Sequence, residues 1–319
     1  MRETLTDRRG LFVGIGIAAL LAIVLLAAGE KESLVIGTIT GAAYGLVALG
    51  LVLIYKSSGV FNFAQGEFGT VALYVLYLLD FKVPYGLAVV GALLAAVVMG
   101  LLVERLVVRP LFDAPRVTLL VATAGVALLA VGVEIWFGGA QGKAIDRALP
   151  TLDRVTILGV QVSDQRLALI VILVVLAVVL GWFFNRTNLG LAILGASQER
   201  TATELMGISV RRLSGFTWGL AALLGGLAAV IAVPETGSFT PGVVTFAYLI
   251  PAFTAAVLGG MTSLPGAFLG GVIIGIAQSV AVSAPIFDDV PGNPGTLTVF
   301  VVLVAVLAIR PQGLLGKAG

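Results

Sequence analysis

The sequence has neither cysteine nor histidine among its 319 residues. Without these two residue types it can form no disulfide, no thiol nucleophile and no zinc site of the common cysteine and histidine kinds. It also lacks the base of a Ser-His-Asp triad and any histidine proton relay. We therefore predict no catalytic residues and no metal ligands, and a chain that is not an enzyme.

Charge is scarce as well. Only 11% of the residues are charged and 59% are hydrophobic, whereas a soluble domain has roughly 25% charged residues. This composition predicts an all-α polytopic membrane protein. The formal net charge of +2 is too small to indicate a nucleic-acid partner, so the excess of lysine and arginine reports membrane topology instead.

Long uncharged runs predict about 8–10 transmembrane helices in a single domain over residues 1–319, because about twenty apolar residues cross a bilayer. The run at 10–29 is either a signal peptide or a first span, and we favour the span. Two hydrophilic segments interrupt the pattern, an external loop at about 138–166 and a cytoplasmic segment at about 185–212. The other predicted spans are 34–54, 83–103, 117–137, 167–184, 213–233, 243–258, 266–284 and 296–309.

Most of the lysine and arginine lies in alternate loops on the side that carries both ends of the chain. The positive-inside rule therefore predicts that both termini are cytoplasmic. In the external loop, residues 155–162 place β-branched side chains around a glycine, which predicts a small hairpin.

The stretch 60–68 separates two uncharged runs, and the second, 68–79, is too short to cross the ~30 Å core at 1.5 Å per residue. Asn62 followed by Gln65 is a capping-box-like pattern that predicts a helix start here. The stretch is thus either a broken or re-entrant element with Glu67 inside the membrane, or a surface turn with Glu67 near a helix end. The residues alone favour neither. A second carboxylate, Glu134, is expected at the membrane interface.

A shift of the sequence by 200 residues aligns two glycine-rich breaks. We predict an internal repeat, parallel or inverted, and chance matching of glycines is the alternative. The aligned pairs are Gly59 with Gly259, Gly66 with Gly266, and Phe68 with Phe268.

Residues 195–212 predict a helix of about two turns. Thr201 with Glu204 is a capping-box pair, Ser197 is an alternative N-cap, and Gly207 fits the C′ position. This helix packs on its own protein, enters a groove on a partner, or lies solvated between spans. Its apolar side consists of Ala202, Leu205 and Met206.

From about residue 34 onward, the order and spacing of several motifs resemble the membrane permeases of branched-chain amino-acid ABC transporters. The family pattern Asn-Phe-Ala-His-Gly-Glu corresponds to Asn62–Glu67, with Gln65 in place of the usual histidine. Gln65 cannot change charge near neutral pH, which puts any protonation role at that position in doubt. The other matching stretches are 40–50, 205–208, 257–261, 265–267 and 310–314.

The resemblance implies a permease subunit of an ATP-driven ABC importer that translocates branched-chain or hydrophobic amino acids. Its partners would be a second permease, two cytoplasmic ATPases and an extracytoplasmic solute-binding protein received in part by loop 138–166. The membrane would be a bacterial-type inner membrane. ATP and Mg would bind to the ATPases, and this chain has no Gly-x-x-x-x-Gly-Lys-Ser/Thr motif.

The resemblance also implies roles for two groups of residues. Asn62, Gln65 and Glu67 would line or brace the substrate pathway. A second group would couple the permease to an ATPase, namely Thr201, Glu204, Leu205, Met206 and Gly207.

Two other classes of function are weighed against this one. A self-contained secondary transporter for a small polar solute would need coupling-ion ligands inside the membrane. Glu67 and Glu134 are the candidates, and two carboxylates are few for such a site. An intramembrane enzyme has still less support, since the chain has no histidine or cysteine. The solute, whether branched-chain amino acid, urea-like amide or short acid, and the choice of homodimer or heterodimer are left open by the sequence.

Overall fold

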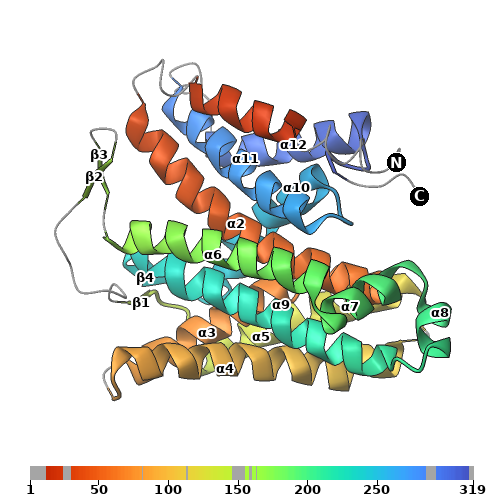
Figure 1. The fold of residues 1–319 in the computed structure, drawn as a ribbon. Helices are drawn as coiled ribbons and strands as arrows, with labels where there is room; N and C mark the ends of the chain where they lie inside the picture. Colours follow the sequence, from red (N-terminus) through yellow and green to blue (C-terminus); the bar gives the residue numbers. More distant parts are fainter. Residues whose placement is uncertain are drawn as a thin grey trace. The chain divides into compact units, whose positions relative to one another are not determined.

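The computed structural model describes residues 12–23, 30–80, 82–112, 114–145, 155–157, 160–162, 164–284 and 292–315. These residues are predominantly helical (Figure 1). The α-helices are α2 Lys31–Ser58, α3 Gln65–Leu79, α4 Tyr85–Val103, α5 Arg116–Gly138, α6 Asp164–Arg186, α7 Asn188–Gln198, α8 Arg200–Leu205, α9 Val210–Ala232, α10 Ile250–Gly259, α11 Leu264–Ser283 and α12 Pro294–Ile309.

Shorter elements extend or join these helices. Two are π-helical and two are 3₁₀ turns, namely η1 Glu104–Val108 and η4 Thr245–Leu249, and η2 Arg109–Leu111 and η3 Val233–Thr236. Four short strands in the described residues form two antiparallel pairs. They are β1 Lys143–Ala144 with β4 Ser238–Phe239, and β2 Val155–Ile157 with β3 Val160–Val162. The second pair confirms the hairpin predicted at 155–162.

Five helical stretches in the described part of the chain are long and apolar enough to cross a membrane. A sixth candidate is the pair 174–184 and 188–196, bent by 76°. With the shorter apolar helices, they confirm an all-α polytopic membrane protein. The long stretches are Lys31–Ser58, Tyr85–Leu111, Arg116–Gly138, Val210–Thr236 and Leu264–Ser283, and the short ones are Phe12–Ile23, Thr245–Gly259 and Pro294–Ile309.

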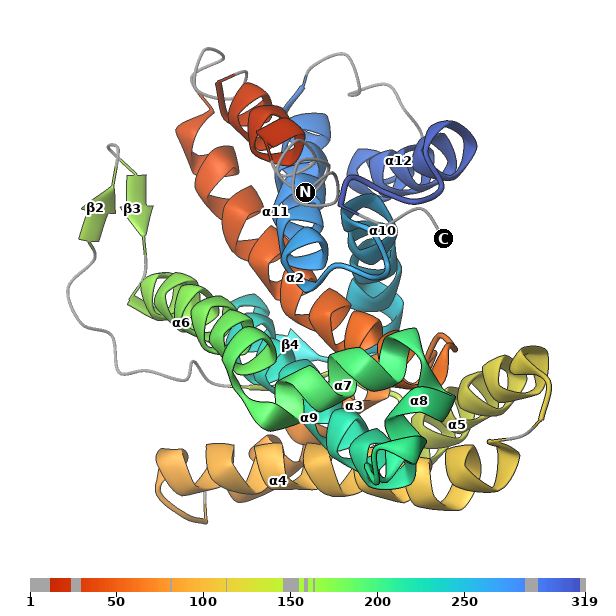
Figure 2. The ribbon, with the colours of Figure 1, turned by 45° about the vertical axis from the view of Figure 1, so that its right-hand side comes forward.

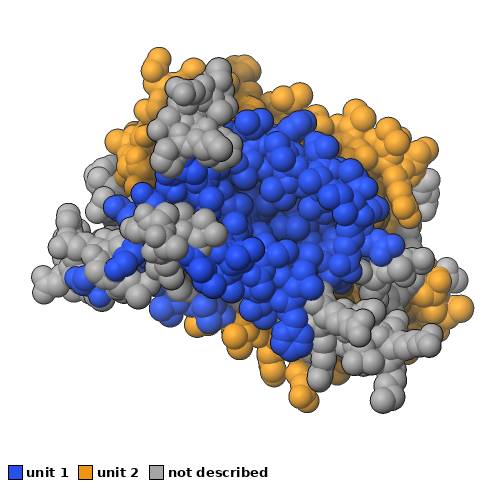
Figure 3. Space-filling model, turned by 90° about the horizontal axis from the view of Figure 1, so that it is seen from above, with its two compact units in different colours: residues 1–49, 149–174, 250–319 blue, residues 50–148, 175–249 orange. Residues whose placement is uncertain are grey.

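The chain divides into two compact units, coloured separately in Figure 3. Unit 1 comprises residues 1–49, 149–174 and 250–319, and unit 2 comprises residues 50–148 and 175–249. That all 319 residues act as one permease domain stays a prediction.

In unit 1, the first part of α2 packs against α11 through glycines. A methyl group added to Gly41 would lie 2.6 Å from the carbonyl oxygen of Gly271. Tyr44 on α2 also donates a hydrogen bond of 2.9 Å from its hydroxyl to Oε1 of Gln278 on α11. The small residues let the two backbones approach closely enough for these contacts, as in other membrane helix pairs.

The hairpin of α10 and α11 and the helix α12 also belong to unit 1 (Figure 2). After α12 the chain returns to the end of α10, where the backbone N–H groups of Leu314 and Leu315 donate to the carbonyl oxygens of Leu258 and Gly259, at 2.7 and 3.0 Å. These bonds satisfy carbonyls that the last turn of α10 leaves without helical partners. They give a structural reason for the motif at 310–314.

Unit 2 is built around α3, α4, α5 and α9, and its α4–α9 contact follows a stripe of small residues. One face of α4 is buried at every fourth position, which brings it against α9. The opposite face of α4 carries exposed leucine and valine, as a surface in contact with lipid tails requires. The buried stripe is Ala88, Ala92, Ala96 and Gly100, and the exposed face includes Leu94, Val98 and Leu102.

We predict that Gly100→Ala lowers the stability of the protein by about 1–3 kcal/mol, the usual cost of overpacking. The added methyl would lie 2.6 Å from Cβ of Ala222 and 2.9 Å from the carbonyl oxygen of Trp218. The matched control is Gly132→Ala in α5, where an added methyl meets no atom within 4 Å. The free energy of unfolding of the control should rise by up to about 1 kcal/mol, because alanine has a higher helix propensity than glycine. Thermal unfolding in detergent measures both, and equal melting temperatures would contradict the close contact.

Candidate functional site

The break between α2 and α3 lies beside α5 in unit 2. After Gly59, whose φ of +69° turns the chain back, the backbone N–H of Phe63 donates to Oγ1 of Thr123 at 3.3 Å. Thr123 lies seven residues into α5, about 10 Å along its axis from Arg116. The break therefore runs alongside an apolar span, which favours a broken element over a surface turn. Such backbone survives at membrane depth only when the protein satisfies its polar groups.

Asn62 stabilises the break locally instead of capping a helix. Its side chain is fully buried, and its Oδ1 accepts a hydrogen bond of 3.0 Å from the N–H of Ala64. Helix α3 begins at Gln65 with Ala64 as its N-cap and without a side-chain cap bond. The predicted capping box at Asn62 is therefore wrong, because the asparagine forms a turn with the residue two positions on, a conformation that competes with capping.

Gln65 joins the start of α3 to α9. Its Nε2 donates to the carbonyl oxygen of Ala221 at 2.9 Å, and the side chain is fully buried. Two glycines make room for this amide, since a methyl added to Gly50 would overlap it and one added to Gly225 would lie 3.2 Å from Nε2. In this structure Gln65 thus braces two helices.

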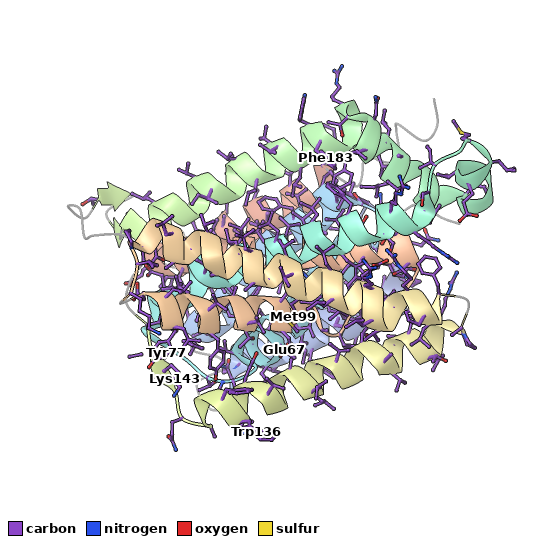
Figure 4. All side chains as sticks on the ribbon, turned by 90° about the horizontal axis from the view of Figure 1, so that it is seen from below. Glu67, Tyr77, Met99, Trp136, Lys143 and Phe183 are labelled. Atoms are coloured by element: carbon purple, nitrogen blue, oxygen red, sulfur yellow. The ribbon has the colours of Figure 1, made fainter. Side chains whose placement is uncertain are left out.

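Glu67 is in the first turn of α3, with none of its side chain exposed. Its carboxyl lies within hydrogen-bonding reach of Glu134 on α5 and of the hydroxyls of Thr70 and Thr245. Figure 4 shows Glu67 inside the bundle, whereas Trp136, two residues after Glu134, lies on its outer side. The first turn of α3, the last turns of α5 and the segment before α10 therefore meet at one point.

Glu134 was expected at the membrane interface, but the protein encloses it. It is only 6% exposed, and its Oε2 accepts a hydrogen bond of 2.8 Å from the backbone N–H of Gly242. The backbone donor comes from a turn 108 residues away in the sequence, so no local pattern indicated it. A carboxyl inside an apolar run was the available signal for a buried group, and its position at the membrane interface stays a prediction.

The segment before α10 closes on this site through Gly66. A methyl added to Gly66 would overlap Thr245, which begins the π-helical turn η4. Single π-helical turns are frequent at functional sites. Thr70, on the next turn of α3, accepts a hydrogen bond of 3.3 Å from the N–H of Val244. Sequence reasoning missed Thr70, Thr245 and Gly242, because each matters only through contacts between distant segments.

The second candidate region is α7 with α8, which contact each other and the first turns of α9 within unit 2. Helix α8 begins at Arg200 with Glu199 as its N-cap, so the predicted start at Thr201 is wrong by two positions. The chain is extended at Glu199, where φ is −146°, and this ends α7 and fixes where α8 begins. The side chains of Ser197 and Thr201 lie outside what the structure describes.

The end of α8 agrees with the prediction. Gly207 has a φ of +79°, and its N–H donates to the carbonyl oxygen of Glu204 at 2.9 Å, while that of Ile208 donates to Thr203 at 3.3 Å. This pair of bonds is a Schellman motif. It holds Leu205 and Met206 with 84% and 78% of their surface exposed.

In the described part of the chain, no cluster of three or more acidic residues could hold a metal ion. The geometry instead offers a closed polar site around Glu67 and an exposed apolar tip on α8. Both belong to unit 2. Each contains residues of a motif that resembles those of known permeases, Asn62–Glu67 in the polar site and 205–208 at the tip of α8.

Comparison with protein families gives a match over residues 33–309 to the model described as the permease component of branched-chain amino acid transport systems. The chain belongs to this family. The match extends over both motif regions and confirms the resemblance drawn from the sequence.

Individual relatives agree. The permease protein BraD of a high-affinity branched-chain amino acid transport system from Pseudomonas aeruginosa is 31% identical over 302 residues, covering 90% of this chain and 95% of the relative. The corresponding LivH protein from Escherichia coli K12 is 27% identical, covering 88% and 94%. A probable LivH from Methanocaldococcus jannaschii is 30% identical, covering 90% and 93%.

We predict that Gly50→Ala and Gln65→Ala are coupled in a double-mutant cycle. Gly50→Ala alone destabilises the protein because its methyl overlaps the Gln65 amide. In a Gln65→Ala background the same change should cost less, by about 1 kcal/mol, as expected for residues in contact. Melting temperatures of the four variants measure the coupling. Gly132→Ala combined with Gln65→Ala is the additive control, and additivity of the Gly50 pair would contradict the contact.

Proposed function

We propose that this permease component works in an ATP-driven importer for branched-chain or other hydrophobic amino acids. The family match supports the solute class, since the relatives are named for branched-chain amino acid transport. A second permease would complete the channel, an extracytoplasmic binding protein would deliver the solute, and two cytoplasmic ATPases would supply ATP and Mg. The chain itself would carry no ATPase site.

The observation that carries the proposal is the exposed apolar tip of α8. Leu205 and Met206 project from a six-residue helix whose C-terminus is fixed by a Schellman motif. A helix this short is marginal alone, and exposing two large apolar side chains to water is costly. An exposed apolar tip of this kind is suited to insertion into a groove on another protein. We propose that the groove belongs to an ATPase subunit.

The distribution of basic residues supports the orientation that this docking needs. Arg211 and Arg212 follow α8 at the start of α9, and Arg310 follows α12. The positive-inside rule would place these ends, and both termini, in the cytoplasm of a bacterial-type cell. The loop at 138–166 would then face the binding protein on the other side.

Asn62, Gln65 and Glu67 are proposed to brace the substrate pathway. None of them has exposed surface. Each holds or approaches another segment of unit 2, namely the break itself, α9 or α5. A movement that opens a path next to α3 must first rearrange these contacts, which would link their geometry to transport.

We expect Leu205→Arg to abolish ATP-dependent leucine uptake in vesicles that contain the companion permease and both ATPases, with binding protein supplied. Loss of a central apolar anchor typically weakens an interface by about 2 kcal/mol, ~30-fold in affinity. The variant should fold normally and fail to retain the ATPase during purification.

The matched control is Ile309→Arg. Ile309 is 83% exposed, almost the same as Leu205, but lies on α12 next to Arg310. It should keep both uptake and ATPase binding. Normal uptake by Leu205→Arg would refute the coupling role of α8, and uptake without any ATPase would replace the importer with a self-contained secondary transporter.

A further inference from the structure

Glu67 and Glu134 form a contact in unit 2 that the transport function does not explain. One side chain is fully buried and the other is 6% exposed, and the two carboxyl groups lie within hydrogen-bonding reach of each other. They come from α3 and α5, which contact each other within unit 2. The pairing of two acidic groups therefore needs its own physical account.

The hydrogen-bond donors at the site do not suffice for two ionised carboxylates. Oε2 of Glu134 accepts from Gly242, but Oε1 of Glu134 and both oxygens of Glu67 are buried without a hydrogen-bond partner. The hydroxyl of Thr70 donates toward the carbonyl oxygen of Gly66 at 3.5 Å, accepts from Val244 and also lies within reach of Glu67. The unpartnered hydroxyl of Thr245 can supply one oxygen of Glu67. The oxygens that face each other are then two acceptors in contact, with no hydrogen between them.

No cation compensates the pair within the described residues. The salt bridge there joins Glu104 to Arg109, whose guanidinium donates to both oxygens of that carboxylate at 3.1–3.3 Å. Neither Glu67 nor Glu134 has such a partner, and Lys143 on β1 forms no ion pair with them. Two unpaired buried charges would each cost several kcal/mol, and adjacent like charges cannot both persist in such an environment.

We propose that Glu67 and Glu134 together bind one proton, which lies between their carboxyl groups and joins α3 to α5. One carboxyl then donates to the other, and the facing oxygens gain the donor that they lack. A proton needs no extra volume, which suits a site where even a methyl on Gly66 would overlap Thr245. A metal ion would need several more oxygen ligands and room for itself.

The other groups that face this pair do not carry positive charge. Tyr74 on α3 has a buried hydroxyl without a hydrogen-bond partner and interacts electrostatically with both glutamates. Tyr248 lies in η4, and the facing part of α9 near Gly225 and Ala229 has no titratable residue. Loss of the proton would therefore leave two like charges in contact, which would separate α3 from α5. The packing of unit 2 depends on this proton.

Infrared spectroscopy of the full chain, purified in detergent at neutral pH, tests the proposal directly. A protonated carboxyl has a carbonyl band apart from those of carboxylates and shifts in D₂O. We expect this band in the wild type and in Glu104→Gln, the matched control at a buried carboxylate with an arginine partner. We expect it to disappear in the double variant Glu67→Gln/Glu134→Gln, which has no acid at the site.

Thermal unfolding of the wild type at different pH values is a second test. It does not require that the glutamine variants keep every contact of the wild type. Wild-type stability should fall as alkaline pH removes the proton, and should not depend on whether sodium or potassium sets the ionic strength. The fall should be smaller in the double variant Glu67→Gln/Glu134→Gln, which keeps an amide donor and has no acid.

Three results would overturn the proposal. No band in the wild type would mean that both groups are ionised. A band that persists in the double variant would belong to another residue. Stabilisation by sodium at constant ionic strength would assign a metal cation to the site. None of these outcomes bears on leucine uptake, so failure here and failure of the importer mechanism are distinguishable.

Discussion

The hydrogen bonds that close the break between α2 and α3 are the constraint on which unit 2 depends. Lipid offers no partner for a free N–H or carbonyl, so a non-helical segment at membrane depth must be satisfied by protein. Thr123 of α5 bonds to the break, Asn62 bonds within it, and Gln65 reaches α9. These three contacts fix where α3 begins, and hence where Glu67 lies.

Close helix packing follows from the same environment. Apolar side chains gain little from leaving lipid for another apolar surface, so helices associate through close approach and dispersion. Glycines at helix contacts serve this purpose in each unit separately. In unit 1 Gly41 meets Gly271, and in unit 2 Gly100 meets α9 at Trp218 and Ala222. Such seams leave no space for movement of single side chains, so any opening has to displace whole helices.

The spans were predictable because length and the absence of charge determine them, and the C-terminus of α8 was predictable because only Gly207 suits its backbone conformation. The start of α3 was not. Asn62 has a side chain that can cap a helix or close a turn, and contacts with α5 decide between them. Likewise the burial of Glu134 depends on Gly242, a partner that no local pattern reveals.

Buried carboxylates in unit 2 are stabilised in two different ways, and the difference bears on mechanism. Glu104 is 2% exposed and paired with Arg109, which also donates to the carbonyl of Arg211 at 3.4 Å, next to the segment that carries α8. The planar guanidinium donates to both oxygens of that carboxylate, so this contact needs no shared proton. Glu67 and Glu134 have each other, a backbone N–H and nearby threonine hydroxyls, and no cation among the described residues pairs with them. A contact that depends on a proton can be broken without unfolding the helices around it. We therefore expect a conformational change in unit 2 to begin at the first turn of α3, where Glu67 lies, and not at the end of α4, where Glu104 is paired with arginine.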